Sequence, residues 1–66
     1  MKLAVNGKEQ ELRDETTLGE LFEQLKLSPE RIVASINGKL ISPDEYAKRA
    51  LGEGDKIEIL SFVGGG

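Results

Sequence analysis

Two Asn-Gly dipeptides, Asn6-Gly7 and Asn37-Gly38, most strongly constrain how this chain of 66 residues can fold. Each lies between two short segments of strand-forming residues, and Asn-Gly supplies the two positive-φ residues of a type I′ hairpin turn. We therefore expect one β-hairpin in each half of the chain. In the first hairpin, Leu3 and Val5 alternate with polar or small residues, and the return strand, roughly 8–13, has the composition of a solvated edge strand.

A helix is predicted between the two hairpins. The segment Thr17-Leu18-Gly19-Glu20 fits a capping box, in which the first and last side chains bond each other's backbone amides. The apolar residues from there on recur at i, i+3, i+4 and i+7 and form one stripe: Leu18, Leu21, Phe22 and Leu25. Ser28-Pro29 is expected to end this helix. Gly19 lies in its first turn, where a glycine is consistent with close packing.

The second half repeats the hairpin and adds a short helix and a strand. Ile32, Ala34 and Ile36 share one face of the strand before the second Asn-Gly turn. Ser42-Pro43-Asp44-Glu45 predicts a second capping box and a short helix that continues through Tyr46 and Ala47; capping is favoured over a pair of catalytic carboxylates. A turn at 52–55 then leads into a last strand, 56–63.

The last strand predicts a binding surface. Because Glu58 belongs in water, alternation places Ile57 and Ile59 in the core and Leu60 and Phe62 on the outward face. Large apolar side chains gathered on a surface suggest a docking patch for another protein. The alternative is that a break in the strand register or the short helix covers them.

The sequence closes on Gly64, Gly65 and Gly66, directly after this strand. Glycine lacks a Cβ atom, so such a tail can lie extended in a channel too narrow for other residues, with an unshielded terminal carboxylate. The tail predicts delivery of a C-terminal carboxyl group into the active site of another protein. The alternative is a frayed end or a linker.

Composition narrows the classes of function. The chain has no Cys and no His, so it lacks a thiol nucleophile, a soft metal ligand and a side chain that titrates near neutrality. We expect no catalytic residues and no metal site. Twelve acidic and nine basic residues give a net charge of −3, which disfavours nucleic acid as a partner. No apolar run is long enough to span a membrane, and we expect a cytoplasmic protein that is monomeric when free.

The chain resembles a known family along its whole length. The features that carry the resemblance are the element order, the Asn-Gly hairpins, Ile36-Asn37-Gly38 followed by a segment with Pro43, and the closing Ser61-Phe62-Val63-Gly64-Gly65-Gly66. They are similar to the ThiS/MoaD family of ubiquitin-like β-grasp sulfur carriers, most closely to its thiamine-biosynthesis members. The resemblance implies an α+β fold, with a mixed sheet of four to five strands covered by one main helix plus a short helix. It also implies a β-grasp domain over 1–63 and a flexible tail over 64–66.

The resemblance further implies a function that other enzymes complete. A ThiF-like adenylyltransferase would use ATP and Mg²⁺ to adenylate the carboxylate of Gly66, and sulfur from a cysteine desulfurase would convert it to a thiocarboxylate. A ThiG-like thiazole synthase would receive the sulfur for thiazole formation. The chain itself would be a carrier and not an enzyme, with no bound cofactor. Gly64 and Gly65 would form the tail, and Leu60, Phe62 and Val63 would dock partners.

Three other functions remain open at this stage. One is a carrier for a different sulfur acceptor, similar to the small subunit of molybdopterin synthase, although the short length favours the thiamine branch. The chain would otherwise be a ubiquitin-like protein modifier, or a binding domain whose glycines are incidental. The sequence leaves open the sulfur acceptor, the sulfur donor, any acyl-disulfide intermediate and the stoichiometry of the complexes.

Overall fold

Both predicted hairpins are present in the computed structural model, which describes residues 1–62. Strands β1 (Lys2–Val5) and β2 (Lys8–Glu11) form the first, and β3 (Ile32–Ile36) and β4 (Lys39–Ile41) form the second. At the turns, φ is 52° and 82° for Asn6-Gly7 and 54° and 84° for Asn37-Gly38, which confirms two pairs of positive-φ residues. Val63 and the predicted tail, 64–66, lie outside the described residues.

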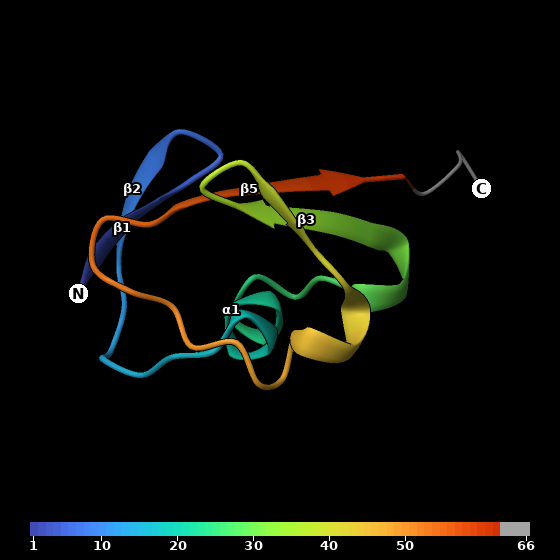
Figure 1. Cartoon of the computed structure of the whole chain (residues 1–66), viewed down its shortest axis with the longest axis horizontal. Coiled ribbons are helices and arrows are strands. Elements are labelled where there is room, and N and C mark those ends of the chain that lie inside the picture. Colours follow the sequence, from blue (N-terminus) through green and yellow to red (C-terminus); the bar gives the residue numbers. More distant parts are fainter. Residues whose placement is uncertain (63–66) are drawn as a thin grey trace.

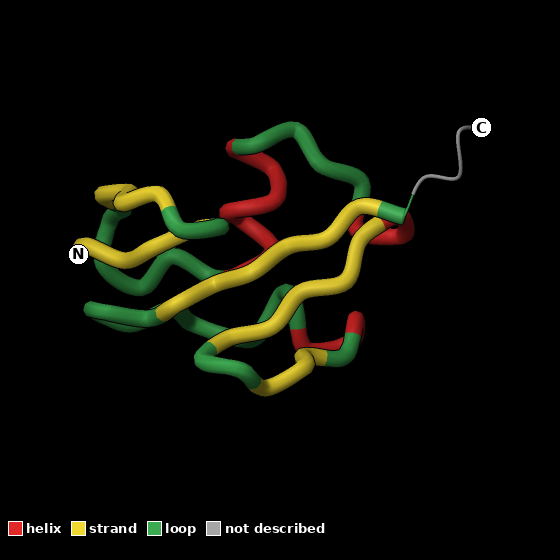
Figure 2. The backbone as a smooth tube through the Cα atoms, turned by 90° about the horizontal axis from the view of Figure 1, so that it is seen from above, coloured by secondary structure: helices red, strands yellow, loops and turns green. Residues whose placement is uncertain are grey.

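The sheet has five strands in the order β2-β1-β5-β3-β4, with β5 (Lys56–Ser61) in its centre. β5 runs parallel to β1 and antiparallel to β3, so the predicted mixed sheet is confirmed. β2 lies at one edge, as its polar composition predicts. Helix α1 (Leu18–Gln24) packs on one face of the sheet (Figure 1). β3 and β5 lie side by side in opposite directions, and β5 leads toward the C-terminal end of the chain (Figure 2).

Helix α1 begins as predicted but ends early. The Thr17 side chain accepts a hydrogen bond from the Glu20 amide and the Glu20 side chain accepts one from the Thr17 amide, which confirms the capping box. At the other end Lys26 has a φ of 59°, and the Leu27 amide donates to the Phe22 carbonyl at 2.9 Å. These bonds turn the chain away before Ser28-Pro29. The prediction that Leu25 lies in the buried stripe is therefore wrong, since this C-cap residue is 40% exposed.

The prediction of a second capping box is also wrong. Residues Pro43–Glu45 form only a 3₁₀ turn, η2, and a similar turn, η1, occupies Pro29–Arg31. The Ser42 hydroxyl donates to a carboxylate oxygen of Asp44 at 2.6 Å and makes no bond to the helix backbone. The backbone of η2 closes bonds to the third preceding residue, a tighter geometry than the α-helix on which a capping box depends.

The core lies between α1 and the sheet. Phe22 is fully buried, and its ring meets that of Tyr46 edge to face, with centroids 4.9 Å apart. Around this pair pack the other apolar side chains that are almost wholly buried: Leu3, Leu18, Leu21, Ile32, Ala34, Ile36, Leu51 and Ile57. Tyr46 thus joins the loop after η2 to the helix. None of the helices within residues 1–62 is long and apolar enough to cross a membrane.

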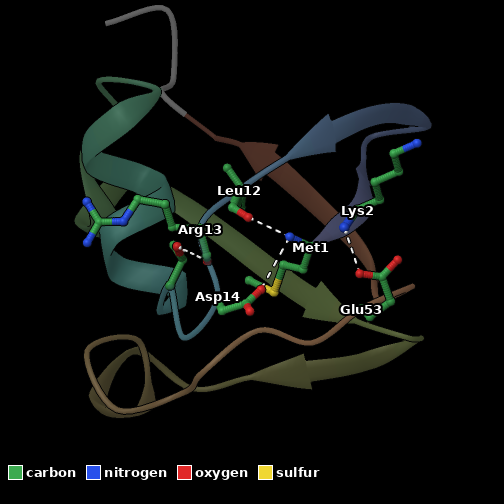
Figure 3. A network of polar contacts seen from close by, with 7 residues as sticks. Met1, Lys2, Leu12, Arg13, Asp14 and Glu53 are labelled. Atoms are coloured by element: carbon green, nitrogen blue, oxygen red, sulfur yellow. Dashed lines mark hydrogen bonds and ion pairs between the residues drawn. The ribbon is translucent and has the colours of Figure 1, made fainter.

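The N-terminal end of β1 is tied to both of its neighbours in the fold (Figure 3). The Met1 ammonium donates to the Leu12 carbonyl at 2.7 Å and lies 3.4 Å from a carboxylate oxygen of Asp14. On the other side, the Lys2 amide donates to the Glu53 side chain at 2.9 Å, and the Gly54 amide donates to the Lys2 carbonyl at 2.7 Å. These bonds fix the turn that precedes β5, and hence the start of the central strand.

Gly19 packs closely, as its position predicted, and this gives a first testable consequence. Its amide donates to the Tyr46 carbonyl at 2.8 Å, and a Cβ atom at this position would lie 3.3 Å from the same oxygen. We expect Gly19→Ala to lower the free energy of unfolding by about 1 kcal/mol, although alanine in an open helix position raises it by a similar amount. Urea denaturation followed by circular dichroism measures the change.

Gly52→Ala is the matched control. A Cβ atom at Gly52 would meet only the Asp55 carboxylate, at an ordinary contact distance of 3.6 Å. This variant should stay within about 0.5 kcal/mol of the wild type. Equal stability of the Gly19→Ala variant and the wild type would show that the contact with Tyr46 relaxes freely.

Candidate functional site

The predicted apolar side chains lie on the outward face of β5 and directly after it. The strand predicted over 56–63 ends at Ser61, so Leu60 lies on β5 and Phe62 follows its end. Ile57 and Ile59 are buried, at 1% and 9% exposure, whereas Leu60 and Phe62 are 69% and 58% exposed. The strand keeps its register with β3 from Ile57 to Ser61, without a break. The expectation that these two side chains face solvent is therefore confirmed for the described residues. Their exposure also excludes the alternative that the short helix covers them, and α1 lies on the other face of the sheet (Figure 1).

The structure adds two residues to this surface. Val33 pairs directly with Leu60 across β3 and β5 and is 38% exposed, and Leu40 on β4 is 70% exposed. Side chains opposite each other on one sheet face lie in contact range. We call Val33, Leu40, Leu60 and Phe62 the docking patch. Val33 could have been found from the sequence, because Ile32 and Ala34 face inward and the residue between them must face out.

The docking patch lies over the end of the central strand. The Phe62 amide donates to the Arg31 carbonyl at 3.0 Å, so the last described residue is still held against the segment that precedes β3. Val63, the third predicted docking residue, follows directly and lies outside the described residues, as do Gly64, Gly65 and Gly66. The patch and the glycine segment are therefore adjacent along the chain.

Residues 1–62 include an apolar surface that is suited to binding, but no cluster of side chains that could hold a metal ion. Within residues 1–62 there is no group of three or more His, Cys, Asp or Glu side chains that could hold a metal ion. Every buried side-chain nitrogen or oxygen atom in this range has a hydrogen-bond partner. The docking patch is apolar, with Ser35 and Glu58 beside it on the same strands. Burial of such an apolar surface against another molecule is favourable, because it removes apolar area from water.

Fold and site together define a class of protein. A mixed sheet in the order β2-β1-β5-β3-β4, one α-helix on one face and an apolar docking patch at the end of the central strand describe a small ubiquitin-like β-grasp protein. The chain belongs to the ThiS family, whose profile matches residues 2–66.

Individual relatives agree with this assignment. The chain is 32% identical to the sulfur carrier protein ThiS of Bacillus subtilis, over 97% of this chain and 98% of that protein. The crystal structure of the thiamine biosynthesis protein ThiS from Geobacter metallireducens superposes with a TM-score of 0.84, at 30% identity and over the whole of both chains. The predicted β-grasp fold and the predicted thiamine branch of the family are thus confirmed.

Longer relatives also match. The chain is 33% identical to a thiazole synthase of Paramagnetospirillum magneticum and 35% identical to one of Magnetococcus marinus, in each case over 100% of this chain. It spans about a fifth of the length of these thiazole synthases, 20% in each case.

Proposed function

We propose that the chain is a sulfur carrier in thiamine biosynthesis that works through the carboxylate of Gly66. Membership of the ThiS family, with a profile match that reaches Gly66, is the observation that carries the proposal. The docking patch supports it, because an exposed apolar surface directly before a glycine tail suits a protein that binds an enzyme and presents its C-terminus. A carrier of this family is not itself an enzyme, so the reacting groups other than the carboxylate belong to partners.

Two steps would convert the carboxylate to a sulfur donor. In the first, a carboxylate oxygen attacks the α-phosphorus of ATP, pyrophosphate leaves, and an acyl adenylate forms. This step is needed because a carboxylate repels nucleophiles and has no good leaving group. In the second, a sulfur nucleophile attacks the acyl carbon and AMP leaves. With sulfide as the nucleophile the exchange involves no net oxidation or reduction, and it yields the thiocarboxylate.

The tail would reach the enzyme while the domain stays outside. Three residues beyond Val63 span roughly 10 Å when extended, at about 3.3 to 3.6 Å each. Gly64 and Gly65 would lie inside a narrow slot of the enzyme, because they have no side chains. Leu60, Phe62 and Val63 would bind at the mouth of this slot. Burial of these three apolar side chains against the enzyme would favour the complex, because it removes apolar area from water.

We propose three partners for this chain. A ThiF-like adenylyltransferase with bound ATP and Mg²⁺ would activate Gly66. A cysteine desulfurase would supply sulfur as a persulfide, from which a thiol reductant would release sulfide for this exchange with formation of a disulfide. A ThiG-like thiazole synthase would accept the sulfur from the thiocarboxylate. The thiazole synthase assignment is supported by the relatives of that name, since each contains a region similar to the whole of this chain. The free chain would be a monomer that forms these complexes in turn.

The intact mass of the protein tests the proposal. After incubation with the activating enzyme, ATP, Mg²⁺ and sulfide, we expect the wild-type mass to change by the replacement of one oxygen with sulfur. Deletion of Gly66 should abolish the change completely, because the carboxylate then ends one residue short of the adenylation site. An unchanged wild-type mass with an enzyme that activates another carrier would overturn the carrier function, and adducts on protein lysines would indicate a modifier.

A further inference from the structure

The central strand is supported unequally along its length. β3 pairs with β5 from Ile57 to Ser61, but β1 contributes only the two pairs Ala4 to Lys56 and Val5 to Ile57. Beyond Val5 the chain turns at Asn6-Gly7 and moves away toward β2. Past Ile57, therefore, no residue of the β1 strand pairs with the part of β5 that carries the docking patch.

The Asn6 side chain takes the place of the missing backbone. Its amide nitrogen donates to the Ile59 carbonyl at 3.2 Å, and its amide oxygen accepts from the Ile59 amide at 2.8 Å. The Asn6 backbone amide meanwhile donates to the Ile57 carbonyl at 2.8 Å. A carboxamide has the donor and acceptor of a peptide group, so these bonds extend the β1 ladder by one step along β5.

The requirements of the turn alone do not explain why residue 6 is Asn. A type I′ turn accepts Asn, Asp or Gly as its first central residue. Only Asn offers both a donor and an acceptor to the peptide groups of Ile59, because Asp has no donor when ionised and Gly has no side chain. At the corresponding position of the second hairpin, Asn37 bonds the Lys56 amide at 3.0 Å and the Asp55 carboxylate at 3.1 Å. That side chain therefore holds the start of β5.

We propose that Asn6 is a positioning residue for carrier function: its side chain holds β5 at Ile59 and so presents Leu60 and Phe62 in one orientation. The proposal rests on the carrier function proposed above. Without this contact the end of β5 is paired on one side only, and binding to the activating enzyme has to order it. Ordering a strand at the moment of binding weakens affinity and leaves the chemistry of the bound state intact.

Asn6→Gly and Asn37→Gly are the matched variants, since glycine keeps both turns and removes only the side-chain bonds. Amide hydrogen exchange on the free proteins reads the local effect. In Asn6→Gly we expect the Ile59 amide to exchange about tenfold faster relative to Leu60, because the Ile59 amide faces Asn6 and alternate amides of β5 face β3. In Asn37→Gly the faster amide should be Lys56. An equal rise at Ile59 and Leu60 would indicate general destabilisation and overturn the proposal.

Activation kinetics read the functional effect. For Asn6→Gly we expect the KM of the activating enzyme to rise about three- to tenfold and kcat to stay within about twofold, whereas Asn37→Gly should resemble the wild type in both. A KM for Asn6→Gly equal to that of Asn37→Gly would overturn the positioning role. If the wild-type protein is not activated at all, both the carrier function and the positioning role of Asn6 are wrong. Faster exchange at Ile59 in Asn6→Gly would still demonstrate the structural contact.

Discussion

Replacement of Phe22 by alanine is expected to bring the domain close to complete unfolding. Phe22 is fully buried and packs edge to face on Tyr46, so its removal leaves a cavity in the middle of the core. Truncation of a buried phenylalanine costs about 3 to 5 kcal/mol. A domain of this length has a total stability of roughly 3 to 10 kcal/mol, so a large part of it is lost. The midpoint of urea denaturation, followed by circular dichroism, measures the effect.

Phe62→Ala is the matched control for this prediction. The same substitution is made at a side chain that is 58% exposed at the end of the sheet. We expect a change of no more than about 0.5 kcal/mol in the free energy of unfolding. Similar losses at Phe22 and Phe62 would contradict the division of the two aromatic residues between core and docking patch.

A charge in the docking patch is expected to weaken partner binding strongly. Leu60→Asp places a carboxylate opposite Val33, at the centre of the apolar surface proposed to meet the activating enzyme. Loss of an anchor residue costs about 2 kcal/mol or more, so the KM for activation should rise at least about thirtyfold. The kcat should change far less, because the carboxylate of Gly66 is untouched. Steady-state kinetics of pyrophosphate release measure both constants.

Leu25→Asp is the control for this second prediction. Leu25 is also an exposed leucine, at 40%, but it lies at the end of α1, away from the docking patch. A negative charge at the C-terminal end of α1 interacts unfavourably with the helix dipole and lowers the free energy of unfolding by up to about 1 kcal/mol. The kinetics are therefore measured at low temperature, where the variant stays folded. We expect the wild-type KM. A matching rise in KM for both variants would place the interface elsewhere.

Two errors of the sequence interpretation have one cause. Leu25 has the spacing of the apolar stripe, yet the chain leaves the helix at Gln24 because Lys26 adopts a positive φ. Ser42 has the residue type of an N-cap, yet its hydroxyl bonds Asp44 instead. In both places local patterns permit more than one conformation, and packing against the rest of the fold selects among them.

The candidate site could be predicted in part. Alternation in β5 was sufficient to place Leu60 and Phe62 on the surface, because the side-chain direction in a strand depends only on neighbouring residues. The contribution of Leu40 could not be predicted in the same way, since it requires that β4 lie beside β3 with its outward face on the same side as that of β5.

The sequence by itself determined the hairpin turns, the capping box of α1, the buried faces of β1, β3 and β5, and the glycine tail. These features depend on dihedral preferences and contacts within about four residues, which short motifs encode. The tertiary structure alone decided the strand order, the extent of the docking patch and the bond between Asn6 and Ile59, which are 53 residues apart. Such contacts form only when the whole chain closes around its core, because their geometry depends on how every intervening element packs.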